Sequence, residues 1–165
     1  FQEAGVDSHQ DFYLSYHFIQ PFDSINHRHF AITTQVRIED LDQKVCPFVQ
    51  VRVIDETDVS FVTLVQKGCE ANASLKLNET FLSGQNNDLS ALGLDLEDWQ
   101  NLRIVTLDGM AEIYINDEIT LSLPTKRDRG RIMGLIIISN TLSSLDFVQL
   151  KDLNNGATFR EDFDR

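Results

Sequence analysis

Residues 99–123 have the sequence WQNLRIVTLDGMAEIYINDEITLSL, and this stretch decides the fold class. Apolar and polar side chains alternate in three runs within it: residues 99–106, 111–115 and 119–123. Alternation with a period of two is typical of β-strands that bury one face. Asp108-Gly109 and Asn116-Asp117 separate the runs, and an Asp-Gly pair in this position is a strong hairpin signal. The stretch therefore predicts three antiparallel strands joined by tight turns.

The same alternation recurs along most of the chain. Further alternating runs lie at residues 30–38, 49–53 and 61–65, and a last pair flanks Asn155-Gly156. Many short strands separated by turn signals favour a sandwich or a barrel. We predict an all-β fold of about ten to twelve strands, arranged as a two-sheet antiparallel β-sandwich of the jelly-roll type. Residues 83–98 interrupt the pattern, and we expect a short helical turn or an irregular loop there.

The length fits one domain over residues 1–165, with residues 1–11 as an N-terminal linker or edge. Hydrophobic residues make up 42% of the chain, which is enough for a sizeable core. The chain begins with Phe1 rather than Met, so we expect a piece of a longer protein or a processed form. The sequence indicates no oligomeric state.

The chain is strongly acidic, with a formal net charge of −12. This charge repels phosphate backbones, so nucleic acid is not an expected partner. Anionic membrane surfaces are disfavoured for the same reason. The sequence also lacks an apolar run long enough to span a bilayer, so we expect no membrane insertion by this segment.

Cys46 and Cys69 are the only cysteines. If the chain turns at residues 55–58, the two cysteines lie almost opposite each other at the open end of the hairpin. A cross-strand disulfide is then geometrically reasonable, and two buried free thiols are the alternative. An oxidised pair would place the domain outside the cytoplasm, in a periplasm, on a cell surface or in a secreted protein.

Four segments together resemble the concanavalin A-like lectin and glucanase superfamily, in particular laminin-G-like and bacterial sugar-binding jelly rolls. They are the run Trp99 to Ile104, the hairpin Asp108 to Asp117, the segment Gly130 to Leu135, and Leu145 to Leu150. The resemblance covers about residues 12–163. It implies a jelly roll in which Trp99 fills the core, but the superfamily contains enzymes, lectins and adhesion modules alike.

No catalytic constellation is evident. The Glu-x-Asp-x-x-Glu strand motif of the laminarinase-like branch does not occur, and neither does a Gly-x-Ser-x-Gly elbow. The acidic clusters at residues 39–42 and 55–58 are interpreted as solvated hairpin tips. We therefore expect a protein that is not an enzyme.

No cofactor is predicted, and calcium is the one metal that the sequence leaves open. Asn86, Asn87, Asp88 and Asp95 lie in one polar segment and have the oxygen ligands that calcium prefers. The segment lacks an EF-hand pattern, and Asn/Asp-rich loops commonly serve only as turns.

Two features are candidate ligand-binding residues. Tyr114 alternates with Ile113 and Ile115, which predicts an exposed ring that could stack on a sugar. His27, Arg28 and His29 form a basic cluster in an acidic chain, suited to an anionic or sugar ligand. The alternative for the cluster is a solvated loop that pairs with nearby acids.

The sequence thus favours a non-catalytic extracytoplasmic binding module of a larger envelope or secreted protein. A carbohydrate is the first candidate partner and a protein the second. A glycoside-acting hydrolase-like domain and a structural spacer or sensor domain are the alternatives.

Overall fold

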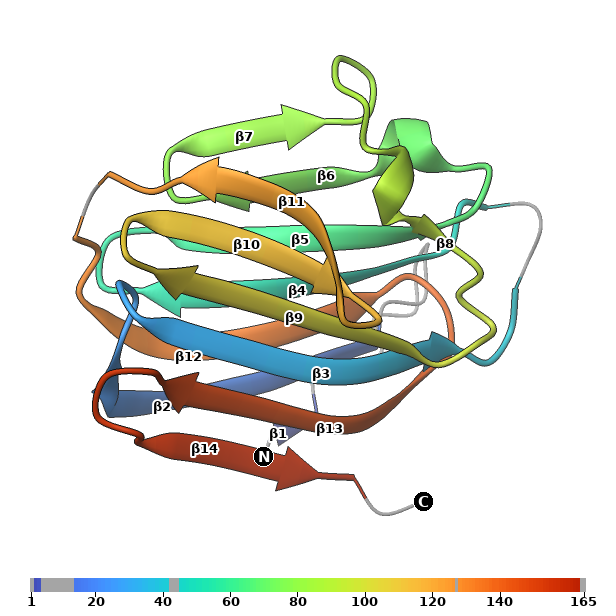
Figure 1. The fold of residues 1–165 in the computed structure, drawn as a ribbon. Coiled ribbons are helices and arrows are strands. Elements are labelled where there is room, and N and C mark those ends of the chain that lie inside the picture. The colour runs from blue at the N-terminus through green and yellow to red at the C-terminus, as the bar shows by residue number, and fades with distance from the viewer. Residues whose placement is uncertain (1, 4–13, 42–44, 127, 164–165) are drawn as a thin grey trace.

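The computed structural model describes residues 2–3, 14–41, 45–126 and 128–163. Over these residues the chain forms two β-sheets that pack face to face (Figure 1). The eight-stranded sheet has the order β1-β2-β12-β4-β5-β6-β7, with β8 paired to β5, and the six-stranded sheet has the order β11-β10-β9-β3-β13-β14. Every strand pair is antiparallel except β5 with β8. The predicted two-sheet sandwich is confirmed.

The strands have the following bounds. The eight-stranded sheet contains β1 (Gln2–Glu3), β2 (Leu14–Asn26), β4 (Phe48–Asp55), β5 (Val59–Gln66), β6 (Ser74–Leu77), β7 (Thr80–Ser83), β8 (Gly93–Leu94) and β12 (Arg131–Ser139). The six-stranded sheet contains β3 (Phe30–Ile38), β9 (Gln100–Leu107), β10 (Met110–Ile115), β11 (Glu118–Pro124), β13 (Ser143–Asp152) and β14 (Thr158–Asp162). Twelve of these strands have four or more residues, in line with the expected ten to twelve, and β1 and β8 are two-residue additions.

The core lies between the two sheets, and the alternation of the strands creates it. In β3 every second residue from Phe30 to Ile38 is buried, and β9 buries Leu102 and Ile104 in the same way. Full burial of one such side chain stabilises the fold by about 1.5–3 kcal/mol. The predicted irregular segment at residues 83–98 adds Leu89, Leu92 and Leu96 to this core around the 3₁₀ turn η2 (Ser90–Leu92).

Both predicted tight turns of residues 99–123 are present. Asp108 and Gly109 have φ angles of 50° and 77°, and Asn116 and Asp117 have φ angles of 51° and 69°. Two successive positive φ angles match the twist of a two-residue hairpin. The second turn manages without glycine because the Asn116 side chain accepts the Asn101 N–H at 2.9 Å and donates to Gln100.

Trp99 does not fill the core, so that expectation was wrong. The residue is half-buried, and the guanidinium of Arg37 lies 4.8 Å from the centre of its ring. The alternation of β9 turns Gln100 inward, where its amide donates to the carbonyls of Asp95 and Asp98. Trp99 is thereby directed to the outer face of the six-stranded sheet.

At the N-terminus, β1 pairs with β2 at the edge of the eight-stranded sheet. The rest of the predicted linker or edge over residues 1–11 lies outside the described residues. No helix in the described part of the chain is long and apolar enough to cross a membrane.

Cys46 and Cys69 form a disulfide, as predicted, with their Cα atoms 5.7 Å apart. The bond closes the open end of the β4–β5 hairpin, where Gln66 N–H donates to the carbonyl of Pro47. It therefore ties the connection before β4 to the segment that follows β5.

Removal of this disulfide should destabilise the domain. For a sequence separation of 23 residues, the loop-closure model gives about 3 kcal/mol. For a chain of this size, that corresponds to a fall in Tm of roughly 6–12 °C. Calorimetry of the Cys46→Ser/Cys69→Ser variant would measure it, with the wild type in reductant as a second readout. An unchanged Tm in both would contradict the prediction.

Candidate ligand-binding site

Turns from both sheets gather at one end of the sandwich, on the left in Figure 1. They connect β2 to β3, β4 to β5, β6 to β7 and β9 to β10. Residues 125–130, which we call the strap, cross this end from β11 in the six-stranded sheet to β12 in the eight-stranded sheet. Residue 127 of the strap lies outside the described residues. The end therefore combines side chains from segments far apart in the sequence.

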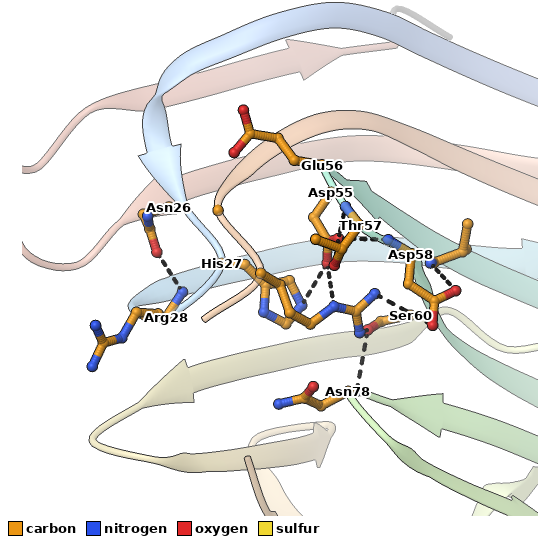
Figure 2. A network of polar contacts seen from close by, with 12 residues as sticks. Asn26, His27, Arg28, Asp55, Glu56, Thr57, Asp58, Ser60 and Asn78 are labelled. Carbon is orange, nitrogen blue, oxygen red and sulfur yellow. Dashed lines mark hydrogen bonds and ion pairs between the residues drawn. The ribbon is translucent and has the colours of Figure 1, made fainter. Parts of the chain in front are cut away.

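Arg129 anchors the strap inside the sandwich. Only 3% of the residue is exposed. Its Nε atom lies 2.7 Å from Oδ2 of Asp55, and its Nη1 atom donates to Oγ of Ser60 at 2.9 Å. Figure 2 shows Asp55 and Ser60 directed toward the same guanidinium. A buried arginine is tolerated because these acceptors replace the water that it loses.

The local sequence positions Asp55 for this role. Its Oδ1 atom accepts hydrogen bonds from the backbone and side chain of Thr57 and from the backbone of Asp58, each at 2.9 Å (Figure 2). These bonds form a turn in which the aspartate caps its own loop. We interpreted residues 55–58 as solvated turn acids, and for Asp55 this was wrong. The turn is present, but its first carboxylate is buried against Arg129.

The strap has further anchors just after Arg129, at Gly130 and at Arg131, the first residue of β12. Arg131 donates to Glu56 from its backbone and its guanidinium, at 3.1 and 2.7 Å, and these bonds lower the pKa of Glu56. Gly130 has a φ of 74°, and a Cβ atom there would lie 2.0 Å from the Glu56 carboxylate. The backbone N–H of His27 donates to the carbonyl of Gly130 at 2.9 Å. The strap is thus held at its buried face and at its exposed edge.

His27 lies inside this network. The residue is 3% exposed, and its Nε2 atom is 3.6 Å from Oδ2 of Asp55. Burial lowers the pKa of His27 to about 4, although Asp55 acts in the opposite direction. The imidazole is therefore neutral at pH 7, and the positive charge beside Asp55 belongs to Arg129.

The other two residues of the predicted basic cluster diverge from His27. Arg28 is exposed and lies 3.6 Å from Asp128 of the strap. His29 is half-buried, and its Nδ1 atom lies 3.1 Å from the buried carboxylate of Asp152. Burial acts to raise the pKa of Asp152, but backbone N–H donors, Asn26 first, outweigh it and lower this pKa. The three side chains thus point to three different places.

Tyr114 lies on the outer face of the six-stranded sheet, toward the opposite end of β10 from the strap. The guanidinium of Arg103 covers its ring at 4.2 Å. Its hydroxyl donates to Glu112 at 2.6 Å, which raises the pKa of Tyr114. Arginines cover two further rings on this face: Arg37 covers Trp99, and Arg160 covers Phe147 at 4.4 Å. These rings are already engaged within the protein.

Two hollows open on either side of the strap. The Arg28 hollow, of about 290 Å³, is lined by His27, Arg28, Thr106, Gly109, Thr125, Lys126 and Asp128. The Lys76 hollow, of about 370 Å³, is lined by Thr57, Asp58, Lys76, Asn78, Glu79, Asp128 and Arg129. Asp128 belongs to both, so the strap forms a shared wall between them.

Two buried donors line the Lys76 hollow. Asn78 is 4% exposed, and its Nδ2 atom has no acceptor among the described residues. The Nη2 atom of Arg129 likewise lacks a hydrogen bond there and lies 4.0 Å from Asp58. A buried donor without an acceptor costs about 1–3 kcal/mol. The lining of the hollow thus includes two buried side chains whose donors are not fully hydrogen-bonded within the described residues.

An aromatic pair adjoins the Lys76 hollow. Lys76 faces Phe61 on one side and Phe81 on the other, on the outer face of the eight-stranded sheet. The two rings have centroids 6.3 Å apart, and Phe81 is 59% exposed. Within the described residues no arginine covers either of these rings, in contrast to Tyr114.

A line of polar side chains lies beside this aromatic pair. Gln50 donates to Thr63 at 2.7 Å, and the hydroxyls of Thr63 and Ser74 are 3.2 Å apart. Arg52 donates to Gln50 at the end of the line. The outer face thus combines an open ring with a row of donors and acceptors.

The structure adds nothing in favour of calcium. Over the described residues, no group of three or more His, Cys, Asp or Glu side chains is placed to hold a metal ion. Asp88, one of the candidates, instead accepts the backbone N–H of Ser90 at 3.1 Å, and hydrogen bonds from Ser90 lower its pKa.

Comparison with known proteins shows a fold and no family. No protein-family model matches the chain, and no curated protein matches its sequence. A structure titled "Prominent members of the human gut microbiota express endo-acting O-glycanases to initiate mucin breakdown" superposes with a TM-score of 0.56 at 8% identity, over 89% of this chain and 76% of the other. Sheep galectin-11 with glycerol has a TM-score of 0.49 at 7% identity, over 87% and 99%. The carbohydrate-binding module CBM66 from Bacillus subtilis has a TM-score of 0.48 at 8% identity, over 87% and 92%.

At these identities the likeness shows the fold alone. The structure with the TM-score of 0.56 is consistent with the two-sheet sandwich described above. The narrower laminin-G-like or bacterial sugar-binding branch stays a prediction.

Sequence reasoning missed most of the site, including Arg129, Asn78, Lys76 and Phe81. One signal was available. Four of the fourteen Lys and Arg residues fall between positions 126 and 131, in a chain whose net charge is −12. Such a concentration of cations in one connection indicates a specific electrostatic role.

Loss of the Arg129 guanidinium should destabilise the domain strongly. Arg129→Met leaves Asp55 buried without its cation, and breaking a buried pair in this way costs about 3–5 kcal/mol. Arg28→Met is the matched control, because Arg28 is exposed and its loss should change the free energy of unfolding by less than about 0.5 kcal/mol. Urea unfolding of both variants measures the difference. Equal stabilities would contradict the anchoring role of Arg129.

Stability should fall as the pH falls from about 6.5 to about 4. In this window the unfolded chain protonates His27 and the folded chain does not, so protons favour unfolding. The lowered pKa corresponds to a loss of about 3 kcal/mol at most from this residue. The pKa values of Asp58 and Asp152 are also lowered, and the stability that these two carboxylates contribute is lost at lower pH.

Unfolding free energies across this window, measured for the wild type and His27→Gln, test the prediction. The variant should lose much of the slope, whereas Arg28→Gln should keep it. A slope that His27→Gln leaves unchanged would assign the pH dependence to other groups.

Proposed function

We propose that this domain is a non-catalytic glycan-binding module and that its sugar occupies the Lys76 hollow and extends onto Phe81. The observation that carries the proposal is a polar hollow with buried donors that opens beside an exposed ring. Sugars present both hydroxyl groups and apolar C–H faces, so they use the two kinds of surface together.

The donors of the hollow are held in place before any ligand arrives. Arg129 is fixed by Asp55 and Ser60, and Lys76 is paired with Asp58 at 2.5 Å. Preorganised groups lose little conformational entropy on binding, which favours affinity for a small polar ligand. Carboxylates of Asp58 and Asp128 add acceptors for sugar hydroxyls.

A glycoside-acting hydrolase is the alternative, since several carboxylates line the same hollow. A general acid for glycoside cleavage needs a carboxyl group with a raised pKa. The hydrogen bond from Lys76 instead lowers the pKa of Asp58, which keeps this group ionised. This supports binding over cleavage, and a turnover assay with every bound glycan tests it.

The setting we propose is extracytoplasmic, on a cell surface, in a periplasm or in a secreted protein. The Cys46–Cys69 disulfide supports this, because such bonds persist in oxidising compartments. A protein partner at the same surface and a purely structural spacer or sensor role are the remaining alternatives. Both predict that no glycan stabilises the domain.

Phe81→Ala should weaken glycan binding about tenfold, because the lost stacking is of the order of 1.4 kcal/mol. The measurement is a thermal-shift screen of neutral and acidic oligosaccharides, followed by calorimetric titration of the hits. Ile119→Ala is the matched control, since Ile119 is 57% exposed, against 59% for Phe81, but lies in the other sheet.

The control should keep wild-type affinity, and both variants should keep wild-type stability. A panel without a single stabilising glycan would overturn the proposed function. A hit that Phe81→Ala and Ile119→Ala weaken equally would overturn the location of the site.

A further inference from the structure

The Arg28 hollow differs from its neighbour in charge. Two cations, Arg28 and Lys126, line it together with one carboxylate, Asp128, so its formal charge is positive. The Lys76 hollow carries Lys76 and Arg129 against three carboxylates and is formally negative. The two hollows share the strap as a wall, yet they favour ligand groups of opposite sign.

The positive charge of this hollow contrasts with the net charge of the protein. With 26 acidic against 14 basic residues, the protein repels anions at long range. An anion-attracting site must therefore be built from local cations within a Debye length, about 8 Å at physiological salt. Arg28, before β3, and Lys126, in the strap, supply them.

The two cations are positioned differently. Arg28 follows a capped turn, in which its backbone N–H donates to the Asn26 side chain at 2.8 Å, and a carboxylate oxygen of Asp128 lies 3.6 Å from its guanidinium. Lys126 is exposed, and no ion pair is found for it within the described residues. The threonines at 106 and 125 add hydroxyl groups to the same lining.

We propose that the Arg28 hollow binds the anionic group of an acidic sugar, a carboxylate held by Arg28 and Lys126. The guanidinium provides paired donors that match a carboxylate, and the ammonium provides a point charge. Thr125, which is half-buried, then contacts a hydroxyl group of the same sugar ring. The choice of a sugar as the carrier of the charge rests on the proposed function, whereas the anion site rests on the hollow itself.

The test is NMR titration of the ¹⁵N-labelled domain with sodium glucuronate, glucose and sodium acetate at one low ionic strength. Glucuronate should shift the backbone signals of Arg28, Thr106 and Lys126, and should bind at least tenfold more tightly than acetate. Glucose should leave these signals unchanged. Added salt should weaken glucuronate binding, because the contacts are charged and exposed.

Variants assign the site. Arg28→Ala/Lys126→Ala should weaken glucuronate binding at least tenfold, and both residues are exposed, so the fold should persist. Lys67→Ala is the matched control and should keep the affinity, because Lys67 is exposed and follows β5 at the end of the sandwich opposite the strap. An equal loss of affinity in the control would contradict the placement of the site in the Arg28 hollow. Equal binding of acetate and glucuronate would show that the hollow recognises the carboxylate alone and not a sugar.

The outcome is separable from that of the proposed function. Neutral glycans test the Lys76 hollow through Phe81→Ala, and glucuronate tests the Arg28 hollow through Arg28 and Lys126. If glucuronate causes no shift, the anion site in the Arg28 hollow is contradicted and the proposed function is not. If no neutral glycan binds but glucuronate does, the glycan site in the Lys76 hollow is contradicted and the anion site is not.

Discussion

The buried ion pair between Arg129 and Asp55 is the interaction on which the functional end of this sandwich depends. A buried pair seldom adds net stability, because both charges lose their hydration. Here it fixes position instead: the guanidinium reaches in from the strap and meets the end of β4 and Ser60 of β5. Without it, the strap would lose its inner anchor, and both hollows would lose their shared wall.

The fold could be predicted because strand alternation and turn chemistry are local properties. Residues 99–123 contain their own hairpins, and the spacing of Cys46 and Cys69 around one turn was enough to predict their disulfide. The site could not be predicted in this way. Asp55 is buried because Arg129 arrives from 74 positions further along the chain, and nothing near Asp55 distinguishes it from a solvated turn acid.

The aromatic residues show the same limit. Alternation correctly directs Tyr114 outward, yet its value as a sugar platform depends on Arg103 of the neighbouring strand, which covers the ring. Phe81 lies in a four-residue edge strand with little pattern of its own, and its exposure follows from pairing with β6. Whether an outward ring is open or covered is a property of neighbouring strands that one strand's sequence does not contain.

The rigidity of the strap also bears on how this domain would recognise a ligand. Arg129 holds it from inside, the Arg131–Glu56 pair holds it at the surface, and His27 bonds to its backbone. These contacts hold the end of the strap next to β12 in place before a ligand binds, so less conformational entropy is lost there on binding. Because Asp128 faces both hollows, a glycan with a neutral and an acidic residue would meet two sites of fixed separation. On the proposed function, the spacing of the two hollows would select the ligand in addition to their charge.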